Sequence, residues 1–144
     1  MNQTSLWLAI GALAGQIPFS KQKVETALGT RLSEVEKKGN NLFQFFKSQP
    51  IDLADGVVIT DVDLRIKRAG GHPGFLVLKM GGTCVTIEQI RGKYSDLTIT
   101  AQPSGRSLDE ETSFSQSLPW GTLSFGFKER NRNCLATIAF DPKK

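Results

Sequence analysis

The sequence predicts an α+β protein in which helices pack on one face of an antiparallel sheet. Three observations support this prediction: apolar residues at helical spacing near the N-terminus, period-two alternation over residues 56–67, and similar alternation over 120–128. A chain of 144 residues can bury a sizeable core without extra cross-links. We therefore expect a single domain covering residues 1–144.

The composition indicates a soluble globular protein, with 39% hydrophobic and 22% charged residues. The net charge is +4, but lysines and arginines are interspersed with acidic residues. This mixture favours a solvated surface over a nucleic-acid platform, so we expect no nucleic-acid partner. The apolar run near the N-terminus is shorter than the ~20 residues that cross a bilayer, so we also expect no membrane span.

Two helices are expected before the first strand. The first covers residues 3–15, where apolar residues recur at helical spacing. Its stripe consists of Leu6, Trp7, Ile10, Leu13 and Ala14. The second follows Ser20, a residue type that caps helix N-termini, and ends at Gly29, a residue type that ends helices. Val24, Ala27 and Leu28 supply its apolar positions.

The first strands are predicted by aromatic content and alternation. In "LFQFF", residues 42–46, Phe43 and Phe45 share one side of a strand and Phe46 points to the other. Residues 56–67 give the clearest strand, and with 75–80 they form a long hairpin. We expect one face of 56–67 to carry Val58, Thr60, Val62, Leu64 and Ile66. We expect the other face to carry Asp61, Asp63, Arg65 and Lys67.

The second half shows the same order of signals. Thr86 opens a third helix and Gln89 stands three residues later, which is the capping-box arrangement. A short strand is expected over 96–100, and a long polar connection over 102–119, in which a strand around Phe114 is an option. Strands are then predicted over 120–128, with Leu123, Phe125 and Phe127 inward, and over 135–140.

The two halves suggest one unit used twice. Equivalent signals are separated by similar distances along the chain, as for Val24 and Ile90 or Gly56 and Gly121. We therefore predict two repeats, residues 18–80 and 84–142, after the N-terminal helix. The alternative is coincidence, because any α+β domain can contain two similar passages from a helix to a hairpin.

A family resemblance rests on two short motifs. "FSKQKVETALG", residues 19–29, is similar to the helix signature that opens each repeat of beta-lactamase inhibitor protein and of BamE-like small lipoprotein domains. "VTIEQIRGKY", residues 85–94, resembles a second copy without the Leu-Gly ending. The chain also looks like a bacterial immunity protein in size and character. The resemblance implies a rigid sheet that binds another protein and often blocks it.

The expected function is therefore non-enzymatic inhibition of a protein partner, with toxin neutralisation by an immunity protein as the leading form. The first alternative is a structural or envelope-assembly module that binds a protein without inhibiting it. The second is a metal-dependent enzyme that uses Asp61 and Asp63, although these carboxylates also suit the wet side of a strand. The only histidine, His72, has no partner nearby in sequence and is expected to be an exposed loop residue. We expect no cofactor, metal or catalytic residue.

Partner-binding residues are expected in three places. Arg65, Lys67, Lys128 and Arg130 would steer association with an acidic partner. Asp109, Glu110 and Glu111 lie in the long polar connection, which is a candidate for recognition. Trp120 suits either packing beneath the first helix or a binding hot spot.

Two cysteines permit one disulfide or none. Free thiols at Cys84 and Cys134 fit the cytoplasm, which is the expected location. A bond between them would instead favour the periplasm, because disulfides persist in oxidising compartments.

Overall fold

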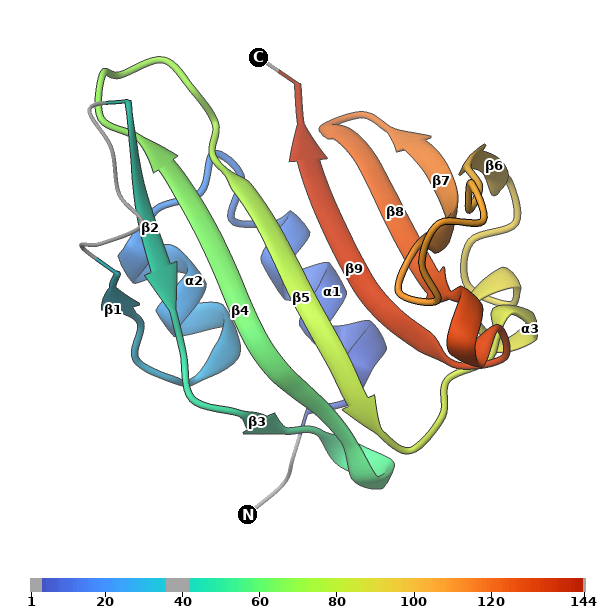
Figure 1. Cartoon of the computed structure of the whole chain (residues 1–144). Coiled ribbons are helices and arrows are strands. Elements are labelled where there is room, and N and C mark those ends of the chain that lie inside the picture. Colours follow the sequence, from blue (N-terminus) through green and yellow to red (C-terminus); the bar gives the residue numbers. More distant parts are fainter. Residues whose placement is uncertain (1–3, 36–41, 144) are drawn as a thin grey trace.

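The computed structural model of the chain describes residues 4–35 and 42–143. These residues form one antiparallel sheet of nine strands together with three α-helices, which confirms the predicted α+β class (Figure 1). Residue 3, where the first helix was predicted to begin, lies outside the described residues. So do residues 36–41 of the first predicted repeat and the end of the predicted domain at residue 144.

The helices and strands alternate in three blocks along the chain. The first block contains α1 (Leu6–Ala14), α2 (Lys21–Leu28), β1 (Ser33–Glu34), β2 (Phe43–Lys47) and β3 (Ile51–Asp52). The second contains the 3-10 turn η1 (Ala54–Gly56), β4 (Val57–Lys67), β5 (Phe75–Gly82), α3 (Ile87–Arg91) and β6 (Thr98–Ala101). The third contains β7 (Glu111–Leu118), β8 (Gly121–Lys128), the 3-10 turn η2 (Glu129–Asn131) and β9 (Leu135–Pro142).

The strand order places the last strand of each half at the centre of the sheet. The order is β1-β2-β4-β5-β9-β8-β7-β6, and β3 pairs with β4 outside this path. The predicted hairpin of β4 and β5 is confirmed, and β7, β8 and β9 form consecutive antiparallel pairs. Strands β5 and β9 join the halves through four residue pairs, from Leu76 opposite Phe140 to Lys79 opposite Thr137.

The helix ends follow the predicted capping residues. The Ser20 side chain accepts a hydrogen bond from the Lys23 N–H at 3.1 Å, and Gly29 ends α2 with φ 66°. That left-handed conformation is open to glycine without a steric penalty. At α3, Thr86 and Gln89 make the reciprocal bonds of a capping box. These contacts satisfy backbone groups that have no partner inside the helix.

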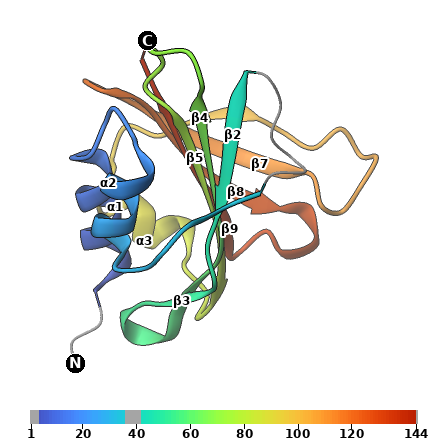
Figure 2. The ribbon, with the colours of Figure 1, turned by 90° about the vertical axis from the view of Figure 1, so that its left-hand side faces the viewer.

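The core lies between the helices and one face of the sheet, which we call the inner face. Figure 2 shows α1, α2 and α3 to the left of the central strands. Buried residues from these helices and from the strands belong to one hydrophobic cluster. The inner face contributes Phe46, Val62, Leu64, Leu76, Leu78, Leu123, Phe125, Ile138 and Phe140. The predicted inward set of β8, which includes Leu123 and Phe125, is confirmed.

The opposite face, which we call the outer face, carries the side chains that alternate with the buried ones. It includes Phe45, Arg65, Phe75, Val77, Ala139, Ser124 and Ser115. Phe46 is only 6% exposed, whereas Phe43 and Phe45 are half-buried. The predicted division of the three phenylalanines between two faces is therefore confirmed.

The predicted faces of 56–67 are wrong at the start of the strand. The register of β4 against β5 shifts between Ile59 and Asp61, where a β-bulge leaves Thr60 as the extra residue. Val57 and Ile59 are buried before the bulge, whereas Thr60 is exposed. An extra residue reverses the alternation, so Val58 and Thr60 do not share the face of Val62.

The long connection predicted over 102–119 is shorter than expected, because residues 111–118 form β7. The optional strand around Phe114 is therefore a full central strand, paired with β6 on one side and β8 on the other. Its outer positions carry serines, which made the segment resemble a polar loop. Residues 102–110 remain as the connection between β6 and β7.

Candidate functional site

The main candidate site is a cluster around Arg65 on the outer face. Arg65 lies opposite Phe45 of β2 and opposite Phe75 of β5 in the sheet register. Its guanidinium carbon lies 5.1 Å from the centre of the Phe45 ring and 5.7 Å from that of Phe75. Both distances fall in the range of cation–π attraction. Three neighbouring strands thus hold a cation between two aromatic rings, and we call these residues, with Asp63, the Arg65 cluster.

Asp63 holds the guanidinium in place from two residues back on the same strand. An Arg65 NH2 nitrogen donates to Asp63 Oδ2 at 3.2 Å, and the Asp63 side chain is only 20% exposed. Asp63 Oδ1 and Arg65 Nε are themselves buried without a hydrogen-bond partner among the described residues. The Arg65 side chain remains 43% exposed, so its free edge faces solvent in a fixed orientation. Fixing the side chain beforehand reduces the entropy lost on binding.

A hollow of about 460 Å³ opens beside this cluster. Its lining consists of Phe43, Phe45, Arg65, His72, Phe75 and Asp141. His72 packs edge-on against Phe43, with ring centres 5.6 Å apart, and its Nδ1 accepts a hydrogen bond from the Gly74 N–H at 3.0 Å. The neutral ring therefore carries its proton on Nε2. His72 is half-buried, so the prediction of an exposed loop histidine is wrong.

The aspartates of β4 each have a cationic partner. Asp61 accepts from Lys47 Nζ at 3.1 Å, and Asp63 is bound to Arg65. Across residues 4–35 and 42–143, no group of three or more His, Cys, Asp or Glu side chains is arranged to hold a metal ion. The geometry of these two carboxylates matches the wet side of a strand.

The four predicted steering cations separate into two groups. Lys67 shares the outer face with Arg65, in register with Phe43. Lys128 and Arg130 lie near Asp109, whose Oδ1 is 2.8 Å from Arg130 Nε and 3.8 Å from Lys128 Nζ. The hydrogen bond from Arg130 is the main cause that lowers the pKa of Asp109. Asp109 therefore partly neutralises the second group.

Glu110 organises the loop between β6 and β7. Its carboxylate accepts hydrogen bonds from the Ser104 hydroxyl at 2.6 Å and from the backbone N–H groups of Ser104, Arg106 and Ser107 at 3.2, 2.9 and 3.2 Å. These bonds, with the Ser104 hydroxyl first, lower the pKa of Glu110. Its structural role is therefore to fold the loop on itself.

This arrangement predicts that the loop loosens in acid. A carboxylate with a lowered pKa in the folded state stabilises the loop above its ordinary pKa of 4.5, and this stabilisation is lost as the pH falls through the lowered value. We expect the amide proton resonances of Arg106 and Ser107 to move upfield together over that range in an NMR titration. In Glu110→Gln the same resonances should not respond to pH there. Unchanged resonances in the unsubstituted protein would contradict the assignment.

Glu111 and Trp120 lie apart from the Arg65 cluster. Glu111 accepts a hydrogen bond from the Thr137 hydroxyl at 2.6 Å and lies over Gly126, where a Cβ atom would collide with its carboxylate. Trp120 stacks on Phe140, with ring centres 5.9 Å apart, and packs against the core. The packing alternative for Trp120 therefore has direct structural support.

Sequence reasoning found Arg65 but missed the aromatic residues beside it. The hairpin places Phe75 opposite Arg65, which counting outward from the loop glycines Gly70 and Gly71 would have suggested. Phe45 carried no comparable signal, because the pairing of β2 with β4 spans a connection of variable geometry. The cluster exists only through these two registers.

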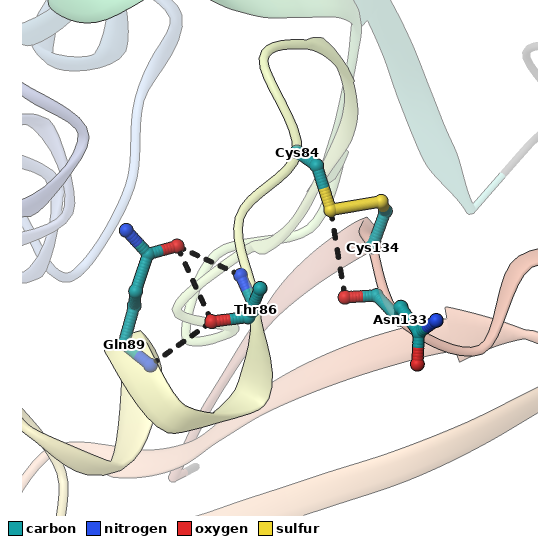
Figure 3. The surroundings of a disulfide bond; sticks show 5 residues. All are labelled: Cys84, Thr86, Gln89, Asn133 and Cys134. Atoms are coloured by element: carbon teal, nitrogen blue, oxygen red, sulfur yellow. Dashed lines mark hydrogen bonds between the residues drawn. A yellow bond between two sulfur atoms is a disulfide. The ribbon is translucent and has the colours of Figure 1, made fainter.

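The cysteines, which the sequence left open, form a disulfide between Cys84 and Cys134. Figure 3 shows the bond beside the capping box of Thr86 and Gln89. The bond joins the segment before α3 to the segment before β9, so it links the end of β5 to the start of the strand that pairs with β5.

No helix among the described residues has the length and apolar character needed to cross a bilayer. Comparison of the chain with protein-family models, with curated proteins and with solved structures finds no match.

Proposed function

We propose that the protein is a non-enzymatic inhibitor that binds another protein through its outer face, most specifically an immunity protein that occludes a bacterial toxin or effector. The single observation that carries the proposal is the Arg65 cluster. Arginine and aromatic side chains dominate the energetics of protein interfaces, and well-ordered side chains lose less entropy on binding. The cluster combines an oriented guanidinium with two aromatic rings and an adjoining hollow.

The architecture supports this use of the sheet. We infer that the helices pack on the inner face alone, as drawn in Figure 2, and leave the outer face available. Beyond the Arg65 cluster, the outer face of β7 and β8 carries Ser113, Ser115, Ser117, Thr122 and Ser124. Small hydroxyl side chains let a partner approach closely and supply both donors and acceptors. Such a surface suits the polar rim around a hot spot.

A tandem repeat is also part of the proposal. Each half has a capped helix followed by three strands, α2-β2-β4-β5 and α3-β7-β8-β9, and the strand order mirrors one half onto the other across the β5–β9 pair. An internal duplication gives this order without further assumptions. The two sheets then act as one stiff platform.

The disulfide favours the periplasm as the place of action. A bond between Cys84 and Cys134 persists in an oxidising compartment, whereas cytosolic thiols are kept reduced. We therefore prefer the periplasmic alternative to the cytoplasm. The partner would then be a toxin or effector that arrives in, or passes through, the same compartment.

The test begins with the partner recovered by co-purification and continues with measured affinities. Arg65→Ala should weaken binding by about 30-fold or more, because it removes a hot-spot side chain worth ~2 kcal/mol or more. Arg65→Lys keeps the charge but loses the planar stacking, so its affinity should fall mainly through faster dissociation. Lys93→Ala, which removes an exposed cation after α3, is the matched control and should bind normally.

The partner's own activity separates the alternatives. Loss of that activity on binding supports inhibition. A bound partner that stays fully active favours the envelope-assembly module. Equal affinities for the unsubstituted protein and for Arg65→Ala would contradict the assignment of the outer face.

A further inference from the structure

A second cleft lies where the two halves of the sheet separate. Strands β5 and β9 pair only as far as Lys79 opposite Thr137, and no pairs are formed between Met80–Gly82 and the start of β9. A cleft of about 430 Å³ occupies this position. Its far end is closed by the disulfide and by the Leu135 N–H, which donates to the Val85 carbonyl at 2.8 Å. We call this space the seam cleft.

The charge of the seam cleft is one-sided. Its lining includes Lys79, Lys128 and Arg130, and none of the described residues that line it is acidic. Asp109, from outside the lining, contacts Lys128 and Arg130, but its side chain is 57% exposed, so water screens its charge. Lys79 has no ion-pair partner within the described part of the chain. Three cations therefore share one exposed carboxylate.

The remaining lining combines small polar groups with an apolar wall. Thr60, Thr83 and Asn131 supply hydroxyl and amide groups. Val57, Met80, Val85, Leu135 and Ala136 supply the apolar wall. The volume falls in the range of small-molecule sites, in which a few polar groups orient a ligand that is otherwise in apolar contact.

Glycine keeps the cleft open along β5. Gly82 has φ 71°, and a Cβ atom there would collide with the Gly56 carbonyl oxygen. At Gly81, a Cβ atom would lie 2.8 Å from Thr60 Cγ2, which is closer than real contacts allow. The bare backbone at these two positions lets a ligand approach the strand directly.

We propose that the seam cleft binds a small organic anion, in which one carboxylate or phosphate group is attached to an apolar body. The oxyanion binds between Lys79 and Lys128, with Arg130 at the rim. The apolar body lies against Met80, Val85 and Leu135. This site does not depend on the proposed protein partner, because the Arg65 cluster belongs to a separate hollow that shares none of its lining residues.

The test uses four probes in NMR titrations of the ¹⁵N-labelled full chain with its disulfide intact. Phenyl phosphate and benzoate share an aromatic body and differ in the anion. Phenol lacks the charge and inorganic phosphate lacks the body. We expect both aromatic anions to give saturable shifts of the Gly81, Gly82 and Asn131 amides. Phenol and inorganic phosphate should bind more weakly by about tenfold, since charge-assisted bonds and apolar burial each contribute ~1–3 kcal/mol.

Variants assign the charge. Lys79→Met should lower the affinity for phenyl phosphate by about tenfold, as expected for a lost charge-assisted contact. Because Lys79 is exposed and has no ion-pair partner among the described residues, the substitution should leave the fold intact, which an unchanged melting temperature would establish. Lys67→Met removes a cation from the same face outside the cleft and should bind normally.

Three outcomes would overturn the proposal. These are the absence of saturable shifts at the cleft amides, equal losses in Lys79→Met and Lys67→Met, and equally tight binding of phenol and phenyl phosphate. Equal binding of inorganic phosphate and phenyl phosphate would overturn the assignment of the apolar wall.

Discussion

Phe140→Ala is expected to destabilise the protein by about 3–5 kcal/mol, the range for deleting a large buried aromatic side chain. Phe140 is fully buried on β9, between Leu76 of β5 and Leu123 of β8 in the sheet register. Its ring meets Phe19 edge-on at 6.1 Å between ring centres and stacks on Trp120 at 5.9 Å. The substitution leaves a cavity at the junction of the two halves, which the surrounding strands cannot close without breaking their pairing.

Chemical denaturation of the unsubstituted protein and the variant measures this effect. Since domains of this size are stable by roughly 5–15 kcal/mol, the variant should retain only part of its stability and melt at least ~10 °C lower. Leu108→Ala is the control, because Leu108 is 56% exposed in the loop before β7. Its effect should stay within about 0.5 kcal/mol. A loss below ~1 kcal/mol in Phe140→Ala would show that this junction is not packed as described.

Removing the disulfide is expected to cost about 2–4 kcal/mol. The bond joins residues separated by 50 positions, so the intact cross-link restricts a long loop of the unfolded chain. It also closes the seam cleft at the end where β5 and β9 are unpaired. The double variant Cys84→Ser/Cys134→Ser should therefore have a lower free energy of unfolding but the same sheet.

Reductant provides the matched experiment. Cys84 is exposed, so dithiothreitol can reach the bond in the folded protein. The unsubstituted protein should lose the same 2–4 kcal/mol on reduction, whereas the double variant should not respond. An unsubstituted protein that is insensitive to reductant would contradict both the stabilising role of the bond and the argument for an oxidising compartment.

The helices and their ends were predictable because their determinants are local. Ser20, Gly29 and the pair Thr86 and Gln89 lie within a few residues of the backbone groups that they satisfy. The alternation in β8 was equally informative, since each inward residue is marked by its own apolar side chain. For such elements the sequence contains the physical cause itself.

Errors arose where a neighbouring strand determines the outcome. The bulge near Thr60 reverses the faces of β4 and is visible only in the pairing with β5. Strand β7 resembled a loop because serines fill its outer positions, yet two neighbouring strands give its backbone complete pairing. A polar segment becomes a central strand when its backbone hydrogen bonds, rather than its side chains, justify the position.

The candidate site shows the same division. Alternation along β4 placed Arg65 with the charged residues, away from Leu64 and Ile66. Its place between Phe45 and Phe75 required the registers of three strands. Likewise, the separation of Arg65 and Lys67 from Lys128 and Arg130 depends on which strand ends lie together.

By itself the sequence determined the fold class, the helix boundaries, the main hairpin and most of the inward-facing residues. The tertiary structure alone decided the bulge in β4, the position of β7, the cysteine pairing, the Arg65 cluster and the seam cleft. The physical reason is range: helix caps and side-chain periodicity act between residues close in the chain. Strand register and disulfide geometry depend instead on segments that folding brings together from distant positions.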